Sequence, residues 1–277
     1  GSTDPKTQAT LSLLEKTKLN VEVFRFPPGG SGSASRPRNK GLELTQTPYV
    51  TYLDPDNEQV NDTYIRLLDR VKDTGADFAI GNMVRFKGKR NRINNSKELK
   101  KAIAKSAALD GNNADLLEKL GFKPMSIQAL VADTAWLKSL NLEQPVGAVG
   151  QDSYFFQQML YYARKVSITS RAAHIYYAEI STSTVNAISP KYYRKYLPLE
   201  EDRAKWLEEV GLLRAYQEDR FTQFLEHWYV KKLENVDPDD LDECIDLIGE
   251  INGIYGLSED SNPEIQRIMD KARALKK

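Results

Sequence analysis

Short apolar runs alternate with helical patterns over the first two thirds of the chain. Apolar and β-branched residues gather at positions 21–26, 49–53 and 78–80, and such runs predict buried strands. Between the second and third runs, apolar residues recur at helical spacing over 64–71. Strand, helix and strand in this order predict a mostly parallel, Rossmann-like sheet covered by helices, so the predicted fold class is α/β.

The strand signals stop in the last third of the chain. Apolar residues form a helical stripe over 212–228, and Asp237-Pro238 and Asn262-Pro263 each have the order typical of a helix start. The predicted domains are residues 1–186, which contain the sheet, and residues 187–277, which form an all-α C-terminal helical domain.

Composition narrows the class of protein. Of the 277 residues, 40% are hydrophobic and 28% are charged, which is ordinary for a globular protein. Lys plus Arg and Asp plus Glu both total 39, so net charge gives no reason to expect a nucleic-acid partner. The single cysteine, Cys244, excludes an internal disulfide. Without a secretory signal or the roughly 20 apolar residues of a membrane span, the sequence predicts a cytoplasmic protein with no transmembrane segment.

Two acidic residues follow the predicted strand 49–53, in the segment Asp54-Pro55-Asp56. Carboxylates at the carboxyl end of a parallel strand lie at the edge where α/β sheets bind ligands. Their oxygens suit Mg²⁺ or Mn²⁺, and such an ion bridges to the phosphates of a nucleotide. The alternative is a simple turn, because Asp-Pro-Asp also has the residues that turns favour.

Five short motifs carry more information by their order than each does alone. They are Gly1-Ser2-Thr3-Asp4, Ser35-Arg36-Pro37-Arg38-Asn39, Asp54-Pro55-Asp56, Gly75-Ala76-Asp77-Phe78 and Gly150-Gln151-Asp152. This series resembles the family 2 glycosyltransferases, which have the GT-A fold, and the resemblance covers about residues 1–186. The helical C-terminal part is similar to that of bacterial members that decorate wall polymers or extend glycans on adhesins.

The resemblance implies a role for each matching position. Asp54 would hold the nucleotide ribose or a metal ion, Asp56 would be the main metal ligand, and Asp152 would be the catalytic base that deprotonates the acceptor. The cofactor would be Mn²⁺ or Mg²⁺. His174 is a further candidate metal ligand, with a buried structural histidine as the alternative. The implied donor-binding residues are Asp4, Arg38, Asn39, Asp54, Asp56, Ser181 and Thr182.

The sequence departs from the family pattern in two places. Gln151 stands where the family has a glutamate before the base, which removes a charge and keeps hydrogen-bonding capacity. The segment from Gly1 to Asp4 corresponds to a turn after the second strand of the family, so we expect the first strands to precede it in a longer chain. The alternative is that Thr3 and Asp4 match by coincidence after an added Gly-Ser.

Two further segments carry polar chemistry. Residues 181–184 resemble the family's polar loop that closes over the diphosphate, with a plain surface loop as the alternative. Residues 85–105 contain nine Lys or Arg and one acidic residue, Glu98. Such a segment steers an anionic substrate or forms a solvated helix face.

The predicted function is that of an inverting, metal-dependent glycosyltransferase. It would move a glucose-type hexose from a UDP-sugar to a hydroxyl of a glycan, glycoprotein or surface-polymer acceptor. The C-terminal helices, rich in tyrosine and tryptophan, would bind acceptor, join a homo-oligomer or simply cover the sheet. Two alternatives stay open: a non-catalytic partner subunit of a glycosyltransferase complex, which Gln151 favours, and a nucleotidyltransferase on a similar sheet.

Overall fold

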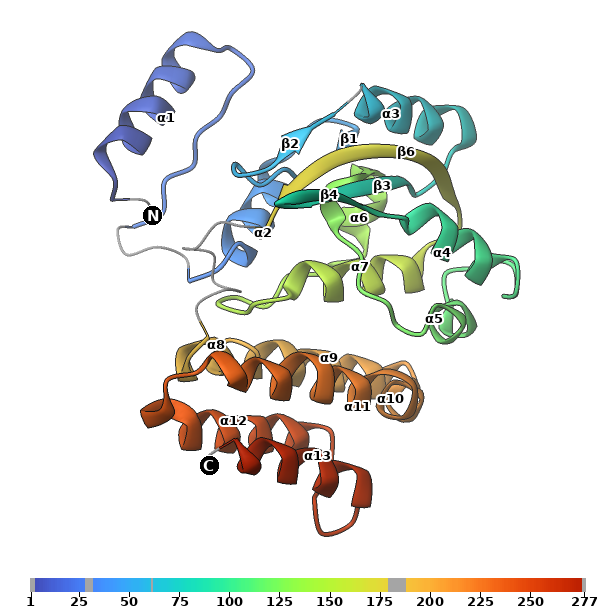
Figure 1. Cartoon of the computed structure of the whole chain (residues 1–277). Coiled ribbons are helices and arrows are strands. Elements are labelled where there is room, and N and C mark those ends of the chain that lie inside the picture. Colours follow the sequence, from blue (N-terminus) through green and yellow to red (C-terminus); the bar gives the residue numbers. More distant parts are fainter. Residues whose placement is uncertain (1–2, 28–31, 61, 179–187, 276–277) are drawn as a thin grey trace.

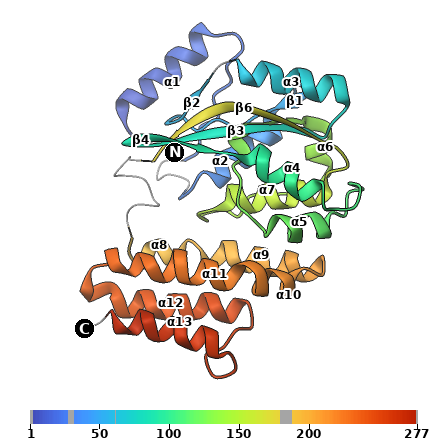
Figure 2. The ribbon, with the colours of Figure 1, turned by 45° about the vertical axis from the view of Figure 1, so that its right-hand side comes forward.

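The molecule is built in layers. The computed structural model describes residues 3–27, 32–60, 62–178 and 188–275. A sheet forms one layer with helices on both of its sides, and the C-terminal helices follow beyond the helices of one side (Figure 1). A view turned by 45° shows the same order (Figure 2). On one side of the sheet lies α3 (Thr63–Thr74). On the other side lie α4 (Asn95–Ile103), α5 (Ala114–Leu120) and α7 (Gln151–Tyr162).

Within the described residues, six strands form the sheet in the order β1-β5-β3-β6-β2, with β4 beside β3. They are β1 (Tyr49–Val50), β2 (Glu58–Gln59), β3 (Phe78–Lys87), β4 (Lys89–Ile93), β5 (Leu130–Asp133) and β6 (Val166–Tyr177). The long central strands β3 and β6 run parallel, and the other pairs are antiparallel. The sheet is therefore mixed and not mostly parallel as expected. β5 runs back between β1 and β3, and a turn at Gly88, with a φ of 62°, folds β4 onto β3 as a hairpin.

Two of the three predicted strands form. β3 begins at Phe78, and β1 occupies the first two residues of the predicted run 49–53. The prediction was wrong for residues 21–26, because no described strand lies beside them to share backbone hydrogen bonds. Instead, the rings of Phe24 and Phe26 pack against each other with centroids 4.9 Å apart, and cationic side chains of the next helix lie over both rings.

The apolar stripe of α3 explains how this helix covers the sheet. Leu67 and Val71 are four positions apart, are 0% and 2% exposed, and face β3, β5 and β6. Gly75, with a φ of 62°, ends the helix. α7 differs in burying most of its residues, because the sheet side lies on one face and α9 (Leu197–Glu209) lies on the other. α7 is thus the layer that joins the sheet to the C-terminal helices.

The remaining helices before residue 178 flank this arrangement. They are α1 (Pro5–Thr17), α2 (Ser35–Leu44) and α6 (Thr134–Ser139). α2 packs against α6, whereas α1 lies apart from the sheet and each of its residues is exposed or half-buried (Figure 1). Among the described helices, none is long and apolar enough to cross a lipid bilayer.

All described elements after residue 188 are helical, as the sequence predicts. Both predicted helix starts are confirmed: Asp237 accepts a hydrogen bond from the Asp239 N–H at 3.1 Å, and Asn262 accepts one from the Glu264 N–H at 3.0 Å. The predicted stripe 212–228 is helical but contains two π-helical segments, η2 and η3. The elements are α8 (Pro190–Arg194), α9, α10 (Leu213–Tyr216), η2 (Gln217–Phe221), α11 (Thr222–Phe224), η3 (Leu225–Val230), η4 (Leu233–Asn235), η5 (Pro238–Asp240), α12 (Leu241–Ile254) and α13 (Pro263–Ala274).

A buried ion pair lies at the centre of the C-terminal helices. Glu200 is 0% and Arg203 6% exposed, and Arg203 Nη1 donates to both Glu200 oxygens at 2.9 and 2.8 Å. The hydroxyls of Tyr229 and Tyr255 also donate to Glu200, at 2.7 and 2.5 Å. This one carboxylate therefore ties α9 to η3 and to the end of α12, and each of its two oxygens has two donors.

Candidate active site

A cavity of about 630 Å³ lies between the segment after β1 and the start of α7. Side chains from α2, β3, β6 and the 3-10 turn η1 (Ile127–Ala129) also line it. The polar lining residues include Arg38, Asp54, Asp56, Arg85, Asn95, Gln128, Gln151, Asp152, Ser153 and Tyr176. Residues predicted from three separate motifs of the sequence therefore meet at one cavity.

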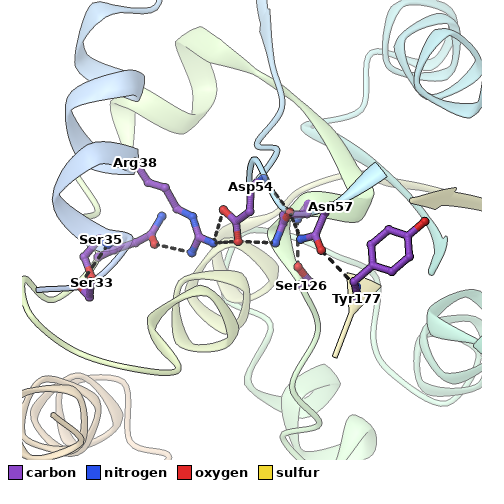
Figure 3. A network of polar contacts seen from close by, with 9 residues as sticks. Ser33, Ser35, Arg38, Asp54, Asn57, Ser126 and Tyr177 are labelled. Atoms are coloured by element: carbon purple, nitrogen blue, oxygen red, sulfur yellow. Dashed lines mark hydrogen bonds and ion pairs between the residues drawn. The ribbon is translucent and has the colours of Figure 1, made fainter. Parts of the chain in front are cut away.

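Arg38 and Asp54 form an ion pair in the wall of this cavity (Figure 3). Arg38 Nη2 donates to both carboxylate oxygens of Asp54, at 2.8 and 2.7 Å. The two side chains are 10% and 29% exposed, so solvent and salt screen this pair less than a surface pair. α2 begins beside the cavity, where Ser33 Oγ accepts from the Ser35 N–H at 3.3 Å.

Gln128 holds the acidic segment in place. Its Nε2 donates to Asp54 Oδ2 at 2.9 Å, and its Oε1 accepts from the Asp54 N–H and from Asn57 Nδ2, both at 2.9 Å. The side chain is 5% exposed. Sequence reasoning missed this residue, because a single glutamine in no motif gives no signal of its position.

Asp56 differs from Asp54 in its surroundings. It lines the same cavity and is exposed. In the part of the chain that the structure describes, no hydrogen bond or ion pair engages its carboxylate. Asp54 is thus neutralised by a guanidinium, while Asp56 leaves a negative charge facing the cavity.

Asp152 is the second residue of α7 and also lines the cavity. Gly150 makes the turn into the helix with a φ of 82°, and a Cβ there would lie 3.2 Å from a methyl carbon of Leu199. Burial raises the pKa of Asp152; Arg38 opposes this shift and the charge of Asp54 adds to it. A carboxylate with a raised pKa is a stronger base than an ordinary one.

Two predicted donor-binding residues, Asp4 and Asn39, lie outside the described lining of this cavity. Asp4 caps α1, where it accepts a hydrogen bond of 2.7 Å from a backbone N–H three residues on. Asn39 joins α2 to the segment before α7 through two hydrogen bonds of 2.9 Å with the Gln144 backbone. Ser181 and Thr182 lie outside the described residues. The donor-binding roles of all four stay predictions.

His174 lies within β6 and is 0% exposed. Neither ring nitrogen has a hydrogen-bond partner among the described residues, and burial lowers its pKa to about 4, so the ring is neutral at pH 7. It does not belong to the described lining of the cavity. This placement resembles a buried structural histidine, and its predicted role as a metal ligand stays untested.

The donor set for a divalent cation is small. Among the described residues, no group of three or more His, Cys, Asp or Glu side chains is arranged to hold a metal ion. The oxygens of Asp54 already accept from Arg38 and Gln128. The carboxylate of Asp56, which makes no ion pair with a described residue, would be an oxygen ligand for such a cation.

Comparison with protein families gives a match that includes the acidic segment 54–56 and helix α2 before it. Residues 1–123 match the family model described as glycosyl transferase family 2. This part of the chain is similar to glycosyl transferase family 2. The family 2 match contains Arg38, Asp54 and Asp56, and the fold confirms the predicted α/β sheet followed by helices. Asp152 lies beyond the match, so its assignment rests on its place in the same cavity.

Solved structures extend the likeness of fold beyond the family 2 match. A crystal structure of S. aureus TarS 1–349 in complex with UDP-GlcNAc has a TM-score of 0.56 and 17% identity, over 99% of this chain and 79% of that chain. The complex of TarS 1–349 with UDP gives 0.54 and 18%, over 99% and 78%. A longer TarS structure gives 0.51 and 19%, with 46% of that chain covered. A comparison with curated proteins gives no match.

Proposed function

We propose that the protein transfers a glucose-type hexose from a UDP-sugar to a hydroxyl group of a glycan, glycoprotein or surface polymer, with inversion at the anomeric carbon. The observation that carries this proposal is the shared cavity of Arg38, Asp54, Asp56 and Asp152. The family 2 match supports sugar transfer, and the UDP-GlcNAc and UDP complexes of TarS support the uridine nucleotide.

The charges of the cavity suit a nucleoside diphosphate. Arg38 and Arg85 supply guanidinium groups that bind phosphate or base oxygens by charge-assisted hydrogen bonds. Asp54, held by Arg38 and Gln128, offers its remaining lone pairs to ribose hydroxyls. Because the acidic segment is anchored before a ligand arrives, little ordering cost remains on binding.

A divalent cation fits this scheme through Asp56. Asp56 would hold Mn²⁺ or Mg²⁺, and the bound ion would supply positive charge to the leaving nucleotide. Asp54 contributes less to metal binding, because breaking its contact with Arg38 would leave a 10%-exposed guanidinium without its partner. The resemblance likewise gives Asp56 as the main metal ligand and leaves Asp54 to hold the ribose or the metal ion.

Asp152 is the base in the proposed reaction. It takes the proton from the acceptor hydroxyl as that oxygen bonds to the anomeric carbon, and the bond from this carbon to UDP breaks on the opposite face. One displacement inverts the configuration, and the proton remains on Asp152 until it passes to solvent. The raised pKa of this carboxyl increases its strength as a base in the transition state.

The test measures UDP binding by calorimetry and UDP release with a panel of nucleotide-sugars and Mn²⁺. We expect one donor to be used, and Asp56→Ala to abolish the metal-dependent release of UDP. Asp69→Ala changes an exposed aspartate of α3 and serves as the matched control. Release of pyrophosphate would indicate nucleotidyl transfer instead. Absence of UDP binding, with Asp56→Ala unchanged from the parent protein, would refute the proposal and favour a non-catalytic subunit.

A further inference from the structure

A second cavity, of about 330 Å³, lies between the start of α7 and the C-terminal helices. Pro124, Gly150, Ser153 and Trp228 line both this cavity and the larger one. Ser153 follows Asp152 directly in α7. A molecule that fills the second cavity therefore lies next to the proposed base, on the side of the C-terminal helices.

One wall of the second cavity comes from the helix that contains both π-helical segments. Arg220 lies in η2, Phe224 in α11, and His227 and Trp228 in η3. π-helical turns are rare and are frequently found at functional sites. The residues of this helix that line the cavity are Tyr216, Arg220, Gln223, Phe224, His227 and Trp228.

The charge of the second cavity is positive. The described lining residues include Arg203 and Arg220 and contain no Asp or Glu. Arg203 is neutralised by Glu200 from behind the wall, at 2.8 Å. Arg220 has no carboxylate within ion-pair distance in the described part of the chain, and its guanidinium carbon lies 5.4 Å from the Phe224 ring centroid. One cation therefore remains uncompensated among largely apolar walls.

A second polar atom points to an anionic ligand. Arg203 is 6% exposed, and its Nε has no hydrogen-bond partner among the described residues. Burial lowers the pKa of Arg220, and the positive charge of Arg203 adds to this shift. A phosphate or carboxylate in the cavity would supply that partner.

We infer that the second cavity is an acceptor subsite that binds an anionic acceptor, with a phosphate or carboxylate held at Arg220 and the reacting hydroxyl directed to Asp152. This inference rests on the proposed transfer reaction for the role of the site. The binding of the anion itself depends only on the second cavity. The apolar face of a sugar ring fits the aromatic walls, and the anionic group near it selects the acceptor.

The experiment measures binding of glucose 6-phosphate, glucuronate and glucose by calorimetry, each with saturating UDP present. We expect glucose 6-phosphate or glucuronate to bind about tenfold more tightly than glucose, and Arg220→Gln to remove the difference. The phosphate and carboxylate arms identify which anion is preferred. Arg214→Gln, an 88%-exposed arginine of the same helix that pairs with Glu218, should keep the preference.

Equal binding of glucose and both anions by the parent protein would overturn the inference, whatever the variants do. A preference that survives in Arg220→Gln would also overturn it, because the anion would then be held elsewhere. UDP binding, measured in the same samples, reports on the proposed function separately. Loss of UDP binding with the anion preference intact would refute UDP-sugar transfer and leave the anion site standing.

Discussion

The buried carboxylate of Glu200 allows a quantitative test of how the C-terminal helices are held together. Replacing Glu200 with glutamine keeps the shape of the side chain and removes its charge. Four hydrogen bonds end on this carboxylate: two from Arg203 and one each from Tyr229 and Tyr255. The variant leaves Arg203 charged, 6% exposed and without its anion.

The expected loss of stability follows from this burial. Breaking a buried pair by removing one partner costs about 3–5 kcal/mol, because the remaining charge stays desolvated. Removing one tyrosine donor, by Tyr229→Phe, should cost about 1.5–3 kcal/mol, the range for a hydrogen bond to a charged group. The ion pair of Glu200 and Arg203 is therefore expected to contribute more to the free energy of unfolding than the hydrogen bond of either tyrosine.

Urea unfolding followed by tryptophan fluorescence measures the effect. With a slope of about 3 kcal/mol per molar urea, Glu200→Gln should lower the midpoint by about 1–1.7 M. Glu218→Gln removes the partner of Arg214 at a pair whose side chains are 88% and 62% exposed, and should lower it by less than about 0.3 M. Equal midpoints for these two variants would show that the buried charge does not carry the stability assigned to it.

Two further predictions concern groups whose pKa is shifted. Because the pKa of His174 is about 4 in the folded protein and ordinarily about 6.5, its contribution to stability is complete above pH 6.5 and is lost as the pH falls toward 4. Between pH 7 and pH 4.5 the unfolding free energy of the parent protein should therefore fall by about 2.5 kcal/mol more than that of His174→Gln. Urea unfolding at both pH values measures this difference, and equal losses in the two proteins would contradict the prediction. Asp152→Asn should reduce turnover about 10²- to 10⁴-fold and leave UDP affinity unchanged. With the parent protein, turnover should decline on acidification at a pH above the ordinary range of an aspartate, because burial raises the pKa of this base; a decline only near pH 4 would exclude Asp152 from that role.

The residues that line the larger cavity could be predicted from the sequence where they belong to a short local motif. Asp54 and Asp56 directly follow an apolar run, and Arg38 and Asp152 stand in motifs whose order resembles family 2. Gln128 was not predictable, because its contacts with Asp54 join residues 74 positions apart and depend on tertiary placement alone. The mixed sheet was missed for a related reason: apolar runs predict strands but not their direction.

One feature of the sequence indicates the first π-helical segment. Tyr216 and Phe221 are both buried, at 2% and 0% exposure, and stand five positions apart in an otherwise regular helical stripe. An α-helix repeats after 3.6 residues, so a spacing of five carries one residue too many for one turn. The prediction of a helix over 212–228 was correct, and the five-residue spacing between Tyr216 and Phe221 marks where the helix departs from α geometry.

The same spacing gives the second cavity tolerance to one change in chain length. Each π turn can be regarded as an α turn with one inserted residue. Deleting one residue from η2 would therefore return that turn to α geometry and leave the later side chains on the same face of the helix. A deletion in a regular α turn has no extra residue to remove and would rotate the later side chains by about 100° about the helix axis. Phe224, His227 and Trp228 should thus stay at the cavity after a deletion within 217–221.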